Sequence, residues 1–111
     1  MPLANNDTLI SMTVLKRKWP FRAALVDDAP DTAGVYALWD NATLLYVGRA
    51  NGGRDTIRTR LLAHLRRAAT QRALAPTHYG WEICRHPKER EAQVLANLHA
   101  NPGENDVPLA A

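Results

Sequence analysis

The sequence predicts one small domain of the α/β class (α+β type), with a three-stranded antiparallel sheet flanked by helices. Residues 34–48 contain two short runs rich in Val, Leu, Tyr and Trp, separated by Asp40-Asn41, which is typical of a β-hairpin. A helical stretch follows, then a third strand-like run at 79–85 and a second helical stretch at 89–99. The order β-β-α-β-α favours a sheet with helices packed against it. A chain of 111 residues is long enough to bury its own core.

Residues 1–31 are expected to form a lead-in that packs on the sheet, and residues 32–111 the main folded unit. The stretch from Leu9 to Leu15 is mixed and β-branched, and is compatible with an extra strand or an extended lead-in. The stretch from Trp19 to Val26 is compatible with a short helix, because proline is tolerated in a first helical turn.

The loop of the hairpin decides where its two tyrosines lie. A three-residue loop at 40–42 would place Tyr36 directly opposite Tyr46. A two-residue loop would place them on opposite faces, because side chains alternate with a period of two. We therefore expect the three-residue loop, with both phenols on one face of the sheet.

The helix after the hairpin carries two neighbouring stripes. Either Asp55 or Thr56 can cap its start. An apolar stripe suited to docking on the sheet follows, formed by Ile57, Leu61, Leu65 and Ala68. A second stripe, about 100° around the helix, contains Arg60, His64 and Arg67. This second stripe is expected at the edge of the buried face. For the later helix we expect an inner side of Ala92, Leu95, Ala96 and His99.

Positive charge is concentrated in one window of the chain. Between Arg49 and Arg72 there are seven arginines and one acidic residue, so this window carries +6 while the whole chain carries +3. Arg outnumbers Lys eleven to three, and guanidinium groups suit bidentate contacts with phosphate. The window therefore favours a polyanionic partner, most often nucleic acid, although charge alone is equally compatible with a solvated helix face.

Other classes of function are disfavoured. A single cysteine, Cys84, excludes an internal disulfide and a cysteine-rich zinc site. No apolar run approaches the roughly 20 residues of a membrane span, and the N-terminus has no signal-peptide pattern. The Gly52-Gly53 loop lacks the lysine and spacing of a phosphate-binding P-loop. We expect a cytoplasmic protein with no small-molecule cofactor and no membrane partner, of undetermined oligomeric state.

Two short motifs of the hairpin mirror each other. Gly34-Val35-Tyr36 is matched by Tyr46-Val47-Gly48, with the second tyrosine ten positions after the first. A helix carrying Arg60 and His64, four positions apart, follows. This arrangement resembles that of the GIY-YIG nucleases. The resemblance covers roughly residues 32–98 and includes Gly34 and Gly48 as motif glycines. It implies that residues 32–111 form the catalytic domain of an endonuclease that hydrolyses DNA phosphodiesters with Mg²⁺ or Mn²⁺.

The resemblance also implies a role for each matching residue. Tyr36 is the candidate general base and Tyr46 positions phosphate or water. Because a free phenol has a pKa near 10, nearby positive charge from Arg60 or Arg49 would have to lower it. Arg60 would stabilise charge in the transition state, and His64 would protonate a leaving group or bind phosphate. The further arginines expected to contact nucleic acid are Arg49, Arg54, Arg58 and Arg67.

The match departs from the family's pattern at the metal ligand. The family holds one divalent cation on a glutamate of the later helix, and Glu91 is the preferred equivalent, with Glu89 as the alternative. A longer form of the motif would put the acid at Ala96, which would leave catalysis in doubt. Two other functions remain open. One is an inactive nucleic-acid-binding domain of the same fold, and the other is a basic module that binds an acidic protein.

Overall fold

The computed structural model describes residues 13–70 and 75–100, and within them a four-stranded antiparallel sheet lies between helices. The strands follow the order β1-β4-β2-β3. In chain order the elements are α2 (Thr13–Lys16), β1 (Trp19–Pro20), α3 (Ala23–Val26), β2 (Gly34–Asp40), β3 (Thr43–Ala50), α4 (Ile57–Thr70), β4 (His78–Ile83) and α5 (Pro87–Ala100). The predicted α+β class is confirmed, with four strands instead of three.

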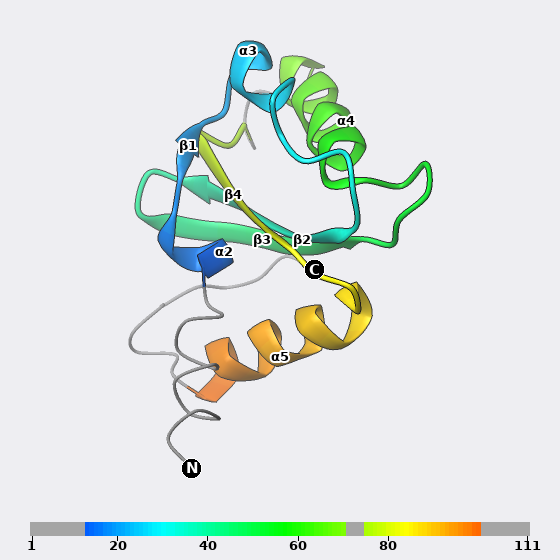
Figure 1. Ribbon diagram of the computed structural model, residues 1–111. Coiled ribbons are helices and arrows are strands. Elements are labelled where there is room, and N and C mark those ends of the chain that lie inside the picture. Colours follow the sequence, from blue (N-terminus) through cyan, green and yellow to red (C-terminus); the bar gives the residue numbers. More distant parts are fainter. Residues whose placement is uncertain (1–12, 71–74, 101–111) are drawn as a thin grey trace.

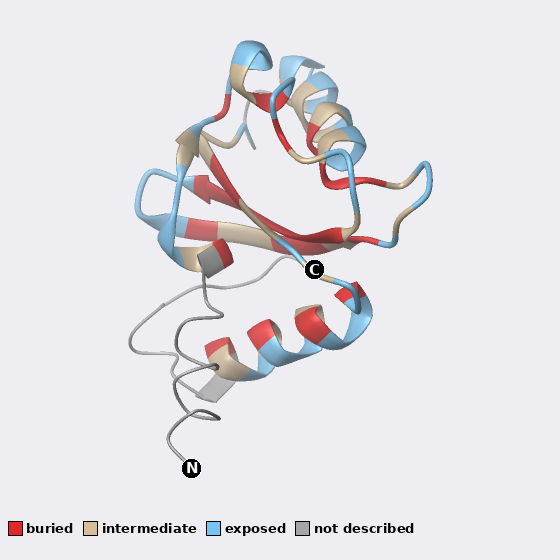
Figure 2. Cartoon of the chain, in the orientation of Figure 1, coloured by how far each residue is buried: buried red, intermediate tan, exposed pale blue. Residues whose placement is uncertain are grey.

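The helices cover opposite faces of the sheet (Figure 1). We call one side the α4 face, where Tyr36, Leu38 and Tyr79 pack with α3 and α4. The other is the α5 face, where residues such as Val35 and Val47 pack with α2 and α5. Nearly all of β2, parts of β3 and β4, and the inward sides of both long helices are buried (Figure 2). The two long helices that carry the candidate site residues are therefore separated by the sheet.

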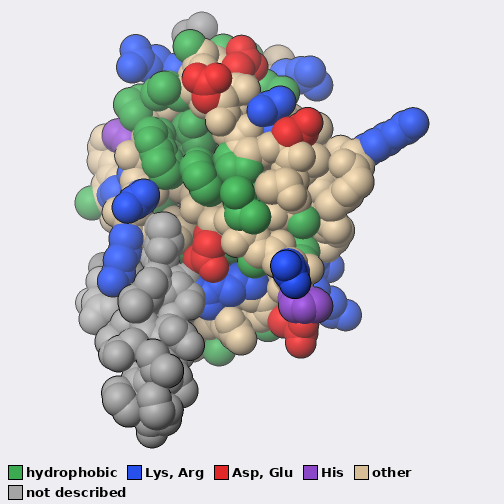
Figure 3. Space-filling model, viewed as in Figure 1, with side chains coloured by type: hydrophobic (Ala, Val, Ile, Leu, Met, Phe, Trp, Pro, Cys, Tyr) green, Lys and Arg blue, Asp and Glu red, His purple; other side chains and the backbone are tan. Residues whose placement is uncertain are grey.

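The extra strand is β1, in a segment for which a helix was expected. Trp19 pairs with Tyr79 of β4, and the ring of Trp19 stacks on that of Trp81 at 5.3 Å with 7° between the planes. Pro20 has no N–H to donate and therefore suits the edge of a sheet. The helix in this segment is only α3, which begins at Ala23. Figure 3 shows apolar side chains gathered over β1, β4 and α3.

The stretch from Leu9 to Leu15 is only partly described, because residues 9–12 lie outside the described part. Its end belongs to the helix α2 and is neither strand nor extended chain. Val14 is fully buried on the α5 face. A Cβ atom on Gly80 would lie 2.6 Å from the backbone oxygen of Val14 and as close to that of Arg17, so a glycine in β4 is what lets α2 approach the sheet.

The hairpin loop contains two residues, Asn41 and Ala42, and the expected three-residue loop is wrong. Tyr36 lies opposite Gly48, not opposite Tyr46, which pairs with Leu38. The register then shifts, because Trp39 pairs with Leu44 and leaves one extra residue in β3. A two-residue loop with regular pairing would place the two tyrosines on opposite faces of the sheet. The extra residue in this bulge brings them back to the same face. Tyr36 and Tyr46 therefore do share a face, with ring centroids 5.9 Å apart.

The helix α4 confirms the apolar stripe expected from its sequence. Ile57 and Leu61 are fully buried against the α4 face, and Leu65 and Ala68 are partly buried there. Thr56 caps the helix, since its hydroxyl accepts from the N–H of Thr59 at 3.1 Å. This leaves the side chain of Asp55 free of the capping role and available for another partner.

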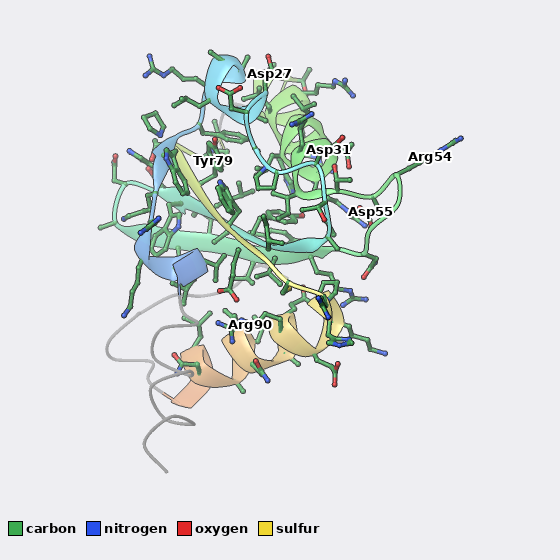
Figure 4. The ribbon with its side chains drawn as sticks, viewed as in Figure 1. Asp27, Asp31, Arg54, Asp55, Tyr79 and Arg90 are labelled. Atoms are coloured by element: carbon green, nitrogen blue, oxygen red, sulfur yellow. The ribbon has the colours of Figure 1, made fainter. Side chains whose placement is uncertain are left out.

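The helix α5 presents a different side from the one expected. Ala92 and Ala96 are exposed, Leu95 is half-buried, and the side chain of His99 lies outside the described part. Val94 and Leu98 pack on the sheet instead. Arg90 lies on the same side, only 8% exposed, with Nε 2.7 Å from Oε2 of Glu82 in β4 (Figure 4). This buried ion pair turns a charged position inward, and the sequence pattern did not indicate it.

No helix among the described residues has both the length and the apolar character needed to cross a bilayer.

Candidate active site

Three aromatic rings from three elements meet on the α4 face. The hydroxyl of Tyr36 in β2 lies 3.0 Å from Nε2 of His64 in α4. The ring of Tyr46 in β3 lies 5.9 Å from that of Tyr36 and 5.4 Å from that of His64. Tyr36 is 1% exposed, while Tyr46 and His64 are half-buried. The hairpin and the helix thus bring together two phenols and an imidazole, with one phenol at the solvent-accessible rim.

Steric crowding explains why glycine occupies both motif positions, Gly34 and Gly48. Gly48 lies opposite Tyr36, and a Cβ atom there would lie 2.6 Å from the hydroxyl of Tyr36 and 2.7 Å from the ring of Tyr46. At Gly34 a Cβ atom would clash with the carbonyl of Glu82 and lie 2.5 Å from Cδ1 of Ile57. Gly34 therefore lets β4 and α4 approach β2, and Gly48 makes room for the phenols.

Tyr36 and His64 are both in their neutral forms at neutral pH. Burial raises the pKa of Tyr36 above its ordinary value, the charge that Tyr46 could carry adds to the effect, and Arg60 opposes it only weakly. The positive charge expected to lower this pKa is thus outweighed by burial. Burial and the charges of Arg67 and Arg60 lower the pKa of His64. A neutral His64 with its proton on Nδ1 accepts the Tyr36 hydroxyl proton at Nε2.

Acidification is expected to destabilise the fold through His64. Because its pKa is lowered in the folded state, the unfolded chain binds a proton at this residue near pH 6.5, where the folded chain does not. The free energy of unfolding should therefore fall as the pH drops below about 6.5. Urea denaturation at about pH 7.5 and about pH 5.5 would measure the loss. A His64→Gln variant should lose less stability between these two values. Equal losses in the natural chain and the variant would contradict the assignment.

Arg60 lies one helical turn before His64, and its guanidinium is tied to Asp55. Its Nε lies 2.6 Å from Oδ1 of Asp55, and Nη2 lies 3.0 Å from Oδ2. The hydrogen bond from Arg60 holds the pKa of Asp55 below its usual value. The hydrogen bond to Asp55 raises the pKa of Arg60, and the charges that Tyr36 and Tyr46 would carry when ionised add to this effect. Arg60 is therefore electrostatically coupled to the two phenols.

The other arginines expected to contact nucleic acid have different surroundings. Arg58 donates from Nε to the carbonyl of Ala29 at 2.9 Å and lies 3.8 Å from Asp31, so it ties α4 to the preceding loop. Arg54 extends away from the body of the protein (Figure 4). Arg67 is exposed on α4, close enough to His64 to lower the pKa of that residue.

Glu91 lies on the helix of the opposite face. Its Oε1 accepts from Nη1 of Arg49 at 2.7 Å, and the carboxylate is 18% exposed. Glu89 is 76% exposed beside His86, and Ala96, the alternative position for the acid, is exposed. Within residues 13–70 and 75–100, no group of three or more His, Cys, Asp or Glu side chains is placed to hold a metal ion. Glu91 would therefore be a single protein ligand among waters and substrate oxygens.

A chain of polar contacts nevertheless joins Glu91 to Arg60 around the end of β3. Arg49 contacts Glu91 through Nη1 and donates from Nε to Oδ1 of Asn51 at 3.1 Å. Asn51 in turn donates to Asp55, which holds Arg60. Sequence reasoning missed Asn51 and treated Asp55 only as a capping residue. The signal that could have found Asp55 is its place at the end of a glycine loop, five residues before Arg60.

Comparison of the chain with protein-family models, with curated proteins and with solved structures found no match.

Proposed function

We propose that this protein is a metal-dependent endonuclease that hydrolyses phosphodiester bonds in DNA, with a site of the GIY-YIG type. The observation that carries the proposal is the hydrogen bond between Tyr36 and His64, with the ring of Tyr46 beside both and Arg60 one turn before His64 on α4. These residues come from the two halves of the hairpin motif and from the Arg-x-x-x-His helix. The contact between these separate parts of the motif supports the proposal.

Hydrolysis of a phosphodiester requires removal of a proton from water and stabilisation of charge on the phosphoryl oxygens. Tyr36 and His64 form a relay for the proton. As the Tyr36 hydroxyl donates its proton to Nε2 of His64, its oxygen accepts one from the attacking water, and the proton gained is held on the imidazole. Tyr46, at the rim of the site, orients the water or the phosphate. The neutral state of His64 at neutral pH suits it to receive the proton.

Arg60 stabilises the charge that develops on the phosphate. A guanidinium has five N–H donors in a planar arrangement, and Asp55 uses those on Nε and Nη2. The remaining donors include both N–H groups of Nη1, which suit an anionic oxygen. The side chain is 45% exposed, so it remains accessible to a substrate while keeping its internal partner.

Glu91 is the residue that would hold the divalent cation. Mg²⁺ binds carboxylate oxygens and keeps several waters, so one carboxylate is a sufficient protein ligand. The pairing of Glu91 with Arg49 means that a cation must share or displace this arginine. When bound, the cation would neutralise charge on the phosphate and on the leaving oxygen.

A Glu91→Gln variant is expected to lose metal-dependent nicking of supercoiled plasmid. Loss of an outer partner of a metal ligand typically lowers metal affinity roughly 10- to 100-fold. Loss of the ligand itself should raise the Mg²⁺ concentration for half-maximal nicking by at least this factor. Glu89→Gln is the matched control, because this acid lies two residues away and is exposed, and its Mg²⁺ dependence should stay unchanged. If Glu89→Gln raised the Mg²⁺ requirement and Glu91→Gln did not, the metal assignment would be wrong.

A specific observation also favours a second function, a nucleic-acid-binding domain that does not cut. Both Arg60 and Glu91 are already engaged in ion pairs, with Asp55 and Arg49, and these pairs compete with phosphate and with metal. Such a domain would bind DNA with an affinity that falls steeply as salt rises, and would leave the plasmid intact. The third function considered, a basic module for an acidic protein, predicts no salt-dependent affinity for DNA.

A further inference from the structure

The contact between Asp55 and Arg60 uses one particular edge of the guanidinium. Oδ1 accepts from Nε and Oδ2 accepts from Nη2, so the carboxylate lies side-on to the arginine. A carboxylate in this position fixes the plane of the guanidinium as well as its place, because two parallel hydrogen bonds prevent rotation. The opposite edge, which carries Nη1, is left for another anion.

Asp55 is itself held by the loop in which it lies. Its Oδ2 accepts from the backbone N–H of Asn51 at 3.0 Å and from Nδ2 of the same residue at 3.4 Å. The backbones of Gly52 and Asp55 exchange hydrogen bonds of 2.8 and 3.1 Å. Gly52 and Gly53 have φ values of 104° and 68°, which favour glycine and close this turn tightly. The carboxylate is thus placed before any substrate binds.

We propose that Asp55 is a positioning residue that aims Arg60 at the phosphate of the nucleic acid. This inference rests on the function proposed above. In this role Asp55 does not touch the substrate; it holds Nε and one side of Nη2, and thereby fixes the direction of the free edge of the guanidinium, which carries Nη1. Such support for a phosphate-binding side chain reduces the ordering that binding would otherwise require.

If Asp55 instead competes with the phosphate, the opposite results are expected. If Asp55 occupied the edge that phosphate needs, it would compete with the substrate, and its removal would strengthen the contribution of Arg60. Removal of any acid also strengthens DNA binding through charge alone. A comparison of single variants therefore cannot separate the two roles. The loss of affinity caused by substituting Arg60 can separate them when it is measured both with and without Asp55.

The experiment is a double-variant cycle on the affinity for a short fluorescein-labelled DNA duplex, measured by anisotropy at low salt with EDTA. Arg60→Gln should weaken binding roughly tenfold in the natural chain, as expected for hydrogen bonds to a charged group. In the Asp55→Asn background, Arg60→Gln should weaken binding less than about twofold, because an arginine that is no longer aligned contributes little to the affinity. In the Asp27→Asn background, which removes an equal charge just after the end of α3 (Figure 4), the tenfold loss in affinity should persist.

A second variant keeps the result decisive if Asp55→Asn does not fold. Asp55→Glu keeps the charge but adds one methylene, which displaces the carboxylate from its side-on contact with Nε and Nη2, and it should also reduce the cost of Arg60→Gln. An undiminished or larger effect of Arg60→Gln in these backgrounds would overturn the positioning role. Because the cycle needs no cleavage, failure of the positioning role and failure of the proposed nuclease activity give different results. If the cycle gives the expected affinities but the natural chain cuts no DNA, only the proposed nuclease activity is refuted. If the natural chain binds no duplex, both the positioning role and the nuclease are overturned.

Discussion

Replacing Arg60 by glutamine is expected to reduce the rate of plasmid nicking by roughly 10²- to 10³-fold, the usual cost of removing one group that stabilises transition-state charge. Arg60 is the arginine that is electrostatically coupled to both phenols, and it lies one turn before His64 on α4. Glutamine keeps an amide of similar polarity but loses the charge and the forked donors, so the fold should be affected little. The loss should appear in the rate at saturating DNA more than in the affinity.

The matched control for this prediction is Arg66→Gln. Arg66 is exposed on the same helix, so the change removes the same charge without touching the site. Nicking should fall less than about threefold, through weaker general attraction to DNA. Equal losses in the two variants would mean that the helix contributes charge to binding and no specific group to the reaction.

Gly48→Ala is expected to damage both the fold and the site. The added methyl group would lie 2.6 Å from the hydroxyl of Tyr36 and 2.7 Å from the ring of Tyr46, and the buried Tyr36 has no room to retreat. Overpacking of this kind costs about 1–3 kcal/mol of stability. Urea denaturation should show this loss. At a temperature where the variant is still folded, nicking should remain low because the bond from Tyr36 to His64 is displaced.

Gly53→Ala is the control for the glycine effect. Gly53 has a φ of 68°, and no atom lies within 4 Å of the position of its Cβ. Alanine there should cost only the backbone penalty of about 1 kcal/mol, with nicking largely kept. Full stability and full activity in Gly48→Ala would show that the sheet can relax around this position and that the motif glycine has another purpose.

The parts of the fold set by local periodicity could be predicted from the sequence. The apolar stripe of α4 was correct, because i, i+4 spacing on one helix needs no knowledge of its partners. The shared face of Tyr36 and Tyr46 was correct for a wrong reason. A bulge in β3 offset the shorter loop, and a run of apolar residues does not reveal where an extra residue is inserted.

The parts that depend on distant partners were missed. The two-residue strand β1 exists because Trp19 pairs with Tyr79, far along the chain. The predicted inner side of α5 was wrong because Arg90 packs inward, where Glu82 of β4 neutralises its charge, and the spacing of apolar residues along the helix does not reveal such a partner. Asp55 was read as a cap because Thr56 and Asp55 are both good capping residues. The contact of Asp55 with Arg60 depends on a loop shape that the residue types alone do not specify.

The most direct measurement for the whole account is nicking of supercoiled plasmid by the natural chain, with Mg²⁺ or Mn²⁺ and again with excess EDTA. The account predicts relaxed and linear products with either metal and intact plasmid with EDTA. Intact plasmid under every condition, together with DNA binding that weakens as salt rises, would contradict the nuclease and leave a domain that binds nucleic acid without cutting it.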